Sequence, residues 1–131
     1  MTTRCNHIEE AYEFMLAYAA QGLASDSGSS AGSQSRGFLA RLDAALDGLA
    51  DVFRGVVAAE QPPGAEQYQA FIGVLERDAH AAQAAVRLVM AQPGISSQLV
   101  DNLNASIHLR ALLTDIFLVD EVLKTTQPAQ A

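Results

Sequence analysis

The sequence predicts an all-α protein, an antiparallel up-and-down four-helix bundle that forms a single domain over residues 1–131. Three observations predict this class. Apolar residues recur three and four positions apart over four long stretches, as on one face of a helix. Glycine and proline separate these stretches, and no stretch alternates apolar and polar residues as a half-buried strand does. Half of the residues are hydrophobic, enough to build a core at this length.

The first helix is expected over residues 6–22. Asn6 is a good N-cap residue, and Glu9 follows three positions later, as in a capping box. Gly22 is expected to end the helix. The next segment, residues 24–35, reads "ASDSGSSAGSQS". It has no large apolar side chain to offset the entropy of ordering, so we expect a flexible serine- and glycine-rich loop.

The second and third helices are expected over residues 36–60 and 65–91. An apolar stripe begins at Phe38 and runs through Leu42, Ala45, Leu49 and Val52, with aspartates on the opposite side. The segment "QPPG" at 61–64 separates the two helices. The third helix has a main apolar stripe and a second strip rich in alanine, which would allow close approach of another helix.

The fourth helix is expected over residues 97–124, with Ser96 or Ser97 as its cap and a frayed tail at 125–131. A helical projection of its second half gives two apolar faces. The smaller face contains Ile107, Ala111, Leu118 and Val122. The larger face contains Leu109, Leu112, Leu113, Ile116, Phe117, Val119 and Leu123.

A helix that is apolar on two faces requires more cover than one four-helix bundle provides. We therefore expect a partner to cover one of the faces, and we assign the larger face as the interface. A homodimer with twofold symmetry is the first expectation for the partner, and a different protein is the alternative. The predicted function is that of a non-enzymatic regulator, chaperone or scaffold that acts through protein–protein interaction.

A narrow polar line separates the two apolar faces. It contains Asp101, His108 and Asp115, each seven residues apart, or about two helical turns. The line is interpreted as a polar seam that fixes the register of the dimer. The alternative function is a binder of a small ligand, metal or cofactor with a site between helices around His108 and Asp115. Tyr12, Tyr18 and Asp101 are the further candidates for that site.

No catalytic or metal-binding pattern is recognised, so we expect no enzyme activity, no metal site and no cofactor. Glu76 and His80 are four residues apart, but their surroundings are typical of a solvated helix face. Cys5 lies close to His7 in the sequence, yet no third group is evident that would orient the histidine as a base. The role of Cys5 is left open.

The charge pattern argues against nucleic acid and membrane partners. The formal net charge is −7, and the eight basic residues are scattered. A protein that binds phosphate backbones or anionic lipid usually shows a basic patch. No apolar run reaches the length of about 20 residues that spans a bilayer. The first residues lack the apolar core of a secretion signal, and a single cysteine makes no internal disulfide, so we expect a cytoplasmic protein.

Overall fold

The computed structural model describes residues 2–26 and 30–126, and every regular element within them is an α-helix. The all-α class is therefore confirmed for the described residues. The four-helix topology is not confirmed, because two of the four predicted helices are each divided in two. The six helices are α1 (Thr2–Ala20), α2 (Ser30–Leu46), α3 (Leu49–Glu60), α4 (Ala65–Met90), α5 (Ser97–Ala105) and α6 (His108–Thr126).

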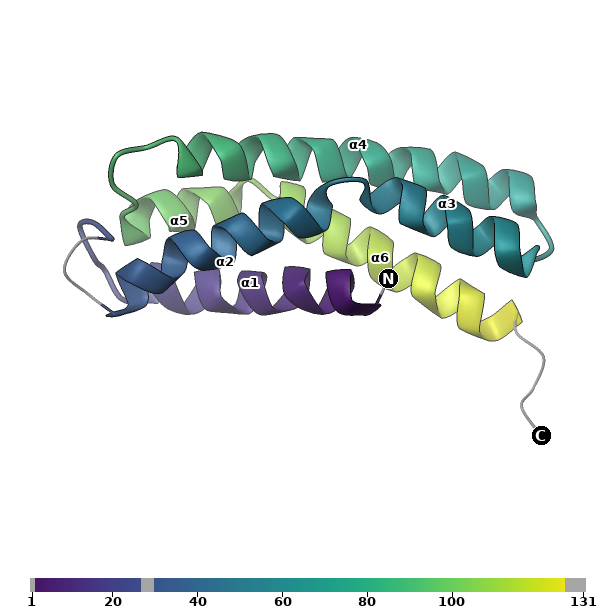
Figure 1. The fold of residues 1–131 in the computed structure, drawn as a ribbon, viewed down its shortest axis with the longest axis horizontal. Coiled ribbons are helices and arrows are strands. Elements are labelled where there is room, and N and C mark those ends of the chain that lie inside the picture. Colours follow the sequence, from purple (N-terminus) through teal and green to yellow (C-terminus); the bar gives the residue numbers. More distant parts are fainter. Residues whose placement is uncertain (1, 27–29, 127–131) are drawn as a thin grey trace.

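The helices surround the core differently at the two ends of the molecule (Figure 1). α4 extends along the whole length, while α2 and α3 follow one another beside it, as do α5 and α6. At one end α1 packs against α2 and α5, and both of these contact α4. At the other end α3 and α6 pack mainly on α4, and α1 does not extend there. The core therefore has less helical cover at the α3–α6 end.

Two residues in the left-handed conformation divide the predicted helices. Gly48 has a φ of 68° and separates α2 from α3, where the sequence predicted one helix over 36–60. Ile107 has a φ of 62° and separates α5 from α6, where one helix was predicted over 97–124. Glycine adopts this conformation without strain, whereas a β-branched residue does so rarely. The side chain of Ser106 assists this break by donating to the carbonyl of Leu103 at 2.6 Å.

The helix ends agree with the sequence in part. Gly22, with a φ of 67°, follows α1 as predicted, and Ser96 caps α5 by accepting from the N–H of Leu99. The capping box at Asn6 is wrong, because α1 begins at Thr2 and Asn6 lies within it. The predicted loop 24–35 is too long, since residues 30–35 are already helical. Residues 27–29 of that loop and 127–131 of the predicted tail lie outside the described residues.

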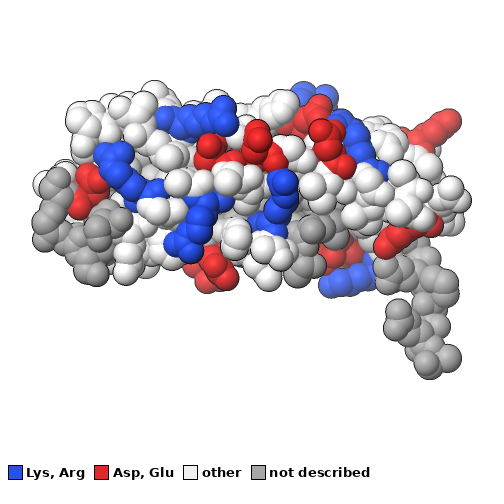
Figure 2. Space-filling view, viewed as in Figure 1, with Lys and Arg blue, Asp and Glu red and all other residues white. Residues whose placement is uncertain are grey.

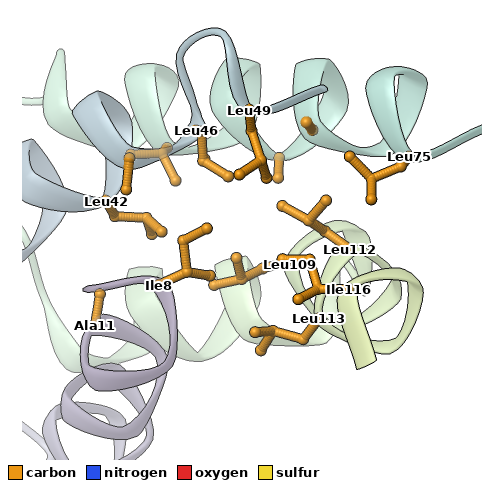
Figure 3. Packing of buried hydrophobic residues seen from close by; sticks show 14 of the residues in the cluster. Ile8, Ala11, Leu42, Leu46, Leu49, Leu75, Leu109, Leu112, Leu113 and Ile116 are labelled. Carbon is orange, nitrogen blue, oxygen red and sulfur yellow. The ribbon is translucent and has the colours of Figure 1, made fainter. Parts of the chain in front are cut away.

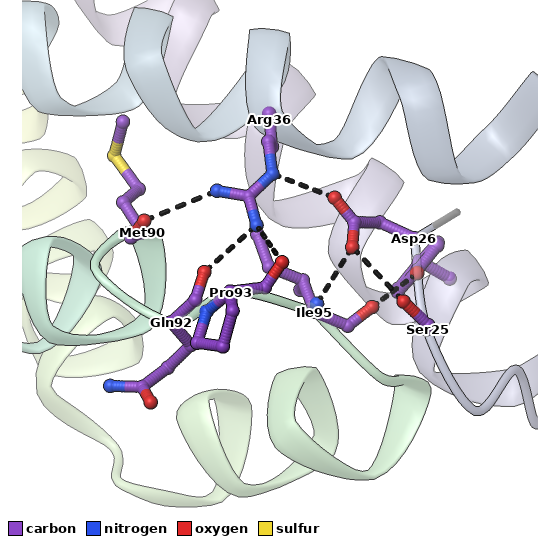
Figure 4. Close-up of polar contacts among 8 residues, drawn as sticks. Ser25, Asp26, Arg36, Met90, Gln92, Pro93 and Ile95 are labelled. Atoms are coloured by element: carbon purple, nitrogen blue, oxygen red, sulfur yellow. Dashed lines mark hydrogen bonds and ion pairs between the residues drawn. The ribbon is translucent and has the colours of Figure 1, made fainter.

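A network around Arg36 explains how a serine-rich segment starts a helix. The guanidinium group donates to the carboxylate of Asp26 at 2.7 Å and to the backbone carbonyls of Met90, Gln92 and Pro93 (Figure 4). Asp26 also accepts from the N–H of Ile95 at 2.9 Å. These contacts fasten the start of α2 to the connection between α4 and α5. Tertiary contacts therefore override the weak helix propensity of the segment.

The core is continuous and draws on all six helices. Leucine, isoleucine and alanine side chains from α1, α2, α3, α4 and α6 point toward one another in the middle of the molecule (Figure 3). Leu103 and Val100 add the buried side of α5. Each of these side chains is removed from water almost completely, and such burial is worth about 1.5–3 kcal/mol for a large aliphatic side chain.

Candidate functional site

The larger apolar face of α6 lies inside the chain. Six of its seven members are at most 6% exposed and belong to the core: Leu109, Leu112, Leu113, Ile116, Val119 and Leu123. These six side chains were assigned to an interface with a partner, and the structure places them against the other helices of the same chain. Little of their surface remains accessible to a partner. Only Phe117, at 54%, is exposed.

The smaller apolar face of α6 is the one that faces solvent. Ile107, just before α6, is exposed, while Leu118 and Val122 are 51% and 37% exposed. Ala111, which lies between Ile107 and Leu118 in the sequence, is half-buried. Within a single chain the larger face is therefore the buried one, and the smaller face is the exposed one. The reason is that α4 and its neighbours already cover the larger face within one chain.

An open groove lies between α6 and the first half of α4. It has a volume of 430 Å³, and both helices contribute apolar side chains. Tyr68 and Phe71 come from α4, while Leu118, Val119 and Val122 come from α6. Pro63 and Gly64, in the turn before α4, also line it. The groove lies at the end of the molecule that α1 does not reach, and within residues 2–26 and 30–126 no helix other than α4 and α6 lines it.

Two acidic side chains meet across the same pair of helices. Asp115 of α6 lies one helical turn from Leu118, and its carboxyl group is within hydrogen-bond reach of Asp78 on α4. Burial, together with the neighbouring Asp78 carboxyl, raises the pKa of Asp115 to about 7. One oxygen of Asp115 is buried and has no hydrogen-bond partner among the described residues. Neither aspartate forms an ion pair with a described residue. A proton or a cation from outside would relieve this repulsion.

The predicted polar line does not exist as one line. Asp101 belongs to α5, while His108 and Asp115 belong to α6, and the turn at Ile107 lies between them. His108 is exposed at the start of α6, two turns from Asp115. The structure therefore does not bring these three side chains to one site. The interpretation of these residues as a seam required one unbroken helix, and the positive φ of Ile107 interrupts that helix.

Two of the other predicted ligand residues share a pocket. Tyr12 and Asp101 line an open pocket of 370 Å³ between α1 and α5, together with Asn104 and Arg110. Tyr18 lies elsewhere, fully buried, and its hydroxyl donates to the carbonyl of Ile95 at 2.6 Å. Burial raises the pKa of Tyr18. This tyrosine holds α1 to the connection before α5.

The remaining candidates do not assemble into a centre. Within residues 2–26 and 30–126, no three histidine, cysteine or acidic side chains are close enough together to hold a metal ion. Glu76 instead forms an ion pair with Arg54 at 2.6 Å. Cys5 is half-buried, and burial raises the pKa of its thiol. It lines a small pocket of 140 Å³ beside Phe53 and Phe117.

Basic and acidic side chains alternate on the face shown in Figure 2. Arg87 pairs with Asp43 at 2.9 Å, and Arg54 pairs with Asp51 and Glu76. The basic side chains on the face in Figure 2 are interspersed with acidic ones and do not form a continuous basic patch. Such pairs at the surface contribute little to stability.

The α4 side of the groove was not predicted from the sequence. Phe71, Val74, Asp78, Ala81 and Ala85 are half-buried and recur three and four residues apart. This spacing places them on one flank of α4, next to α6. The alanine-rich strip noted in the sequence overlaps this flank, but Asp78 and Phe71 were not assigned to it. The same spacing would have revealed both.

Comparisons with family models, with curated proteins and with solved structures give no match. In the part of the chain that the structure describes, none of the helices combines the length and the apolar character required to cross a bilayer.

Proposed function

We propose that this chain is a non-enzymatic protein that acts by binding another protein through the groove between α4 and α6, and that its first partner is a second copy of itself. The observation that supports this proposal is the open apolar groove lined by Phe71, Leu118 and Val122. Large side chains of this kind normally lie against other apolar groups. We assign no catalytic residue, and we place the protein in the cytoplasm on the basis of its sequence alone.

The shape of the groove favours a protein partner over a small molecule. The groove is open along two helices, whereas a site for a small ligand usually encloses most of the ligand's surface. An amphipathic helix fits a groove of this form, with apolar residues at every third or fourth position. The alternative role, a binder of a ligand or cofactor at His108 and Asp115, has less support because His108 and Asp115 do not converge.

The experiment is light scattering over a dilution series, with a matched pair of variants. The wild-type chain is expected at the mass of two chains. Leu118→Glu places a charge at the edge of the groove and is expected to give the mass of one chain. Leu16→Glu is the control, because Leu16 is 48% exposed on α1 and does not line the groove.

Leu113→Glu is unsuitable as a test of association, because Leu113 is only 6% exposed and the charge would disrupt the core. A wild-type chain with the mass of one chain at every concentration overturns the homodimer. A dimer that Leu118→Glu leaves intact overturns the groove as its interface. Circular dichroism of each variant confirms that the chain has folded.

A further inference from the structure

The buried sides of α5 and α6 do not match across the turn at Ile107. On α5 the buried residues are Ser97, Val100 and Leu103, and on α6 they are six members of the larger apolar face. In one continuous helix, at about 100° per residue, these two buried sides would lie about 150° apart. Val100 would instead share the angle of the exposed Leu118. Because α5 and α6 both face the same core, a straight helix would turn one buried side outward.

The turn at Ile107 resolves this mismatch, but it leaves two unfavourable features in the folded chain. Ile107 has a φ of 62°, a conformation that is strained for a β-branched residue, whereas Gly48 makes the turn between α2 and α3 without strain. In the last turn of α5, both polar atoms of the Asn104 amide are buried and have no hydrogen-bond partner among the described residues. A straight helix would remove both features, and residues 97–126 contain no glycine or proline to prevent one.

α5 is the helix that can leave the core at the smaller loss of buried surface. It buries two large apolar side chains, Val100 and Leu103, whereas α6 buries six. The start of α5 is held to α1 through Ser97. The hydroxyl group of Ser97 donates to the carbonyl of Tyr18 at 2.6 Å and accepts from the N–H of Leu23 at 2.8 Å. These two hydrogen bonds and the two apolar side chains oppose the release of α5.

We infer that Ile107 is a hinge between two states of the single chain. In the closed state, which the structure shows, α5 packs on α1 and the chain turns at Ile107. In the open state α5 leaves α1 and continues α6 as one straight helix, while the larger face of α6 stays on α4. This inference goes beyond the proposed function and does not depend on association between copies.

Opening enlarges the apolar surface that the chain exposes. The two large side chains of α5 join the smaller face of α6, and together they form one stripe on the outside of the straight helix. The closed state withholds the α5 part of this stripe by burying it in the core. The members of the stripe are Val100, Leu103, Ile107, Ala111, Leu118 and Val122.

The first test measures opening by the reaction of a buried thiol with dithiodipyridine. Cys5→Ser removes the native thiol, and Val100→Cys places one on the buried side of α5. Val86→Cys is the matched control, because Val86 is also fully buried but lies on α4. At a dilution where light scattering gives the mass of one chain, Val100→Cys is expected to react at least about tenfold faster than Val86→Cys. Its rate is also expected to depend less on urea, because opening exposes less surface than unfolding of the whole chain does.

The role of Ile107 is tested in the same assay. Ile107→Gly is expected to slow the reaction of Val100→Cys about tenfold, because glycine relieves the closed turn and weakens the straight helix. A rate that Ile107→Gly leaves unchanged overturns Ile107 as the hinge. Equal rates and equal urea dependence for Val100→Cys and Val86→Cys show that α5 leaves only when the whole chain unfolds, and they overturn the two states.

Asn102→Ala separates a straight open state from local unfolding of α5. Asn102 is exposed on α5, and alanine is the better helix former. If α5 is helical in both states, the substitution leaves the rate of Val100→Cys unchanged, which is the expected result. If α5 unfolds when it leaves α1, the substitution stabilises only the closed state and slows the reaction about threefold. That slowing overturns the straight helix.

Discussion

The acid pair between α4 and α6 makes a specific prediction about Asp115→Asn. In a single chain the Asp115 carboxyl is close to Asp78, and one of its oxygens is buried without a partner. The ionised form of Asp115 is therefore unfavourable in the folded state. Asparagine has almost the same shape, carries no charge and can donate a hydrogen bond to Asp78. The substitution is expected to stabilise the folded chain wherever Asp115 is otherwise ionised.

The direction of the pH dependence follows from the raised pKa of Asp115. This pKa is about 7 in the folded chain and 3.8 in the reference state. Between these values the folded state holds more protons than the unfolded state, so stability is greatest in acid and falls as the pH rises to about 7. A rise of the Asp115 pKa from 3.8 to about 7 corresponds to a loss of about 4 kcal/mol in unfolding free energy above pH 7. Asp115 is half-buried, and solvent screening reduces the expected effect to about 1–2 kcal/mol.

The assay is urea unfolding at pH 4 and pH 8, at a dilution where light scattering gives the mass of one chain. Asp115→Asn is expected to exceed the wild type in unfolding free energy by about 1–2 kcal/mol at pH 8 and to match it near pH 4. Glu121→Gln is the control, because Glu121 is exposed on the same helix. Equal stability of Asp115→Asn and wild type at pH 8 would refute the repulsion between Asp78 and Asp115.

Three further predictions concern the fold. Leu112→Ala is expected to reduce the unfolding free energy by about 2–5 kcal/mol, and Leu118→Ala by less than about 1 kcal/mol in a single chain, because Leu112 is buried and Leu118 is exposed; similar losses would contradict the assignment of the α6 faces. Ile107→Gly is expected to raise the unfolding free energy by about 1 kcal/mol, because it relieves the left-handed φ of 62°; a lower midpoint in urea would count against strain at this turn. The N–H of Ile95 holds the pKa of Asp26 below its ordinary value of 3.8. The stability that the Asp26 carboxylate contributes is therefore present above that pH and is lost as the pH falls below it. Asp26→Asn is expected to flatten the acid side of a plot of melting temperature against pH.

The two helix breaks show how far the sequence predicts the fold. The helix predicted over 36–60 has the right residues on its buried side, because apolar periodicity reports burial directly when a helix has one apolar face. Gly48 carried a visible signal for a break, since glycine is the residue that most readily adopts a positive φ. Ile107 carried none, because a β-branched residue is among the least suited to that conformation. The chain turns at Ile107 between α5, which packs on α1, and α6, which packs on α4.

The exposed face of α6 could not be predicted from the sequence for a different reason. Periodicity shows that α6 has two apolar faces, but it contains no information on which of them the same chain covers. That depends on where α4 and α1 end in space, and α1 covers only one end of the molecule. The larger face of α6 is the more favourable one to bury, so the helices available within the chain take it first. A partner can then cover only the smaller face, which remains exposed. For a helix with two unequal apolar faces, the smaller face is therefore the better prediction for an interface, and here it is the face that contains Leu118.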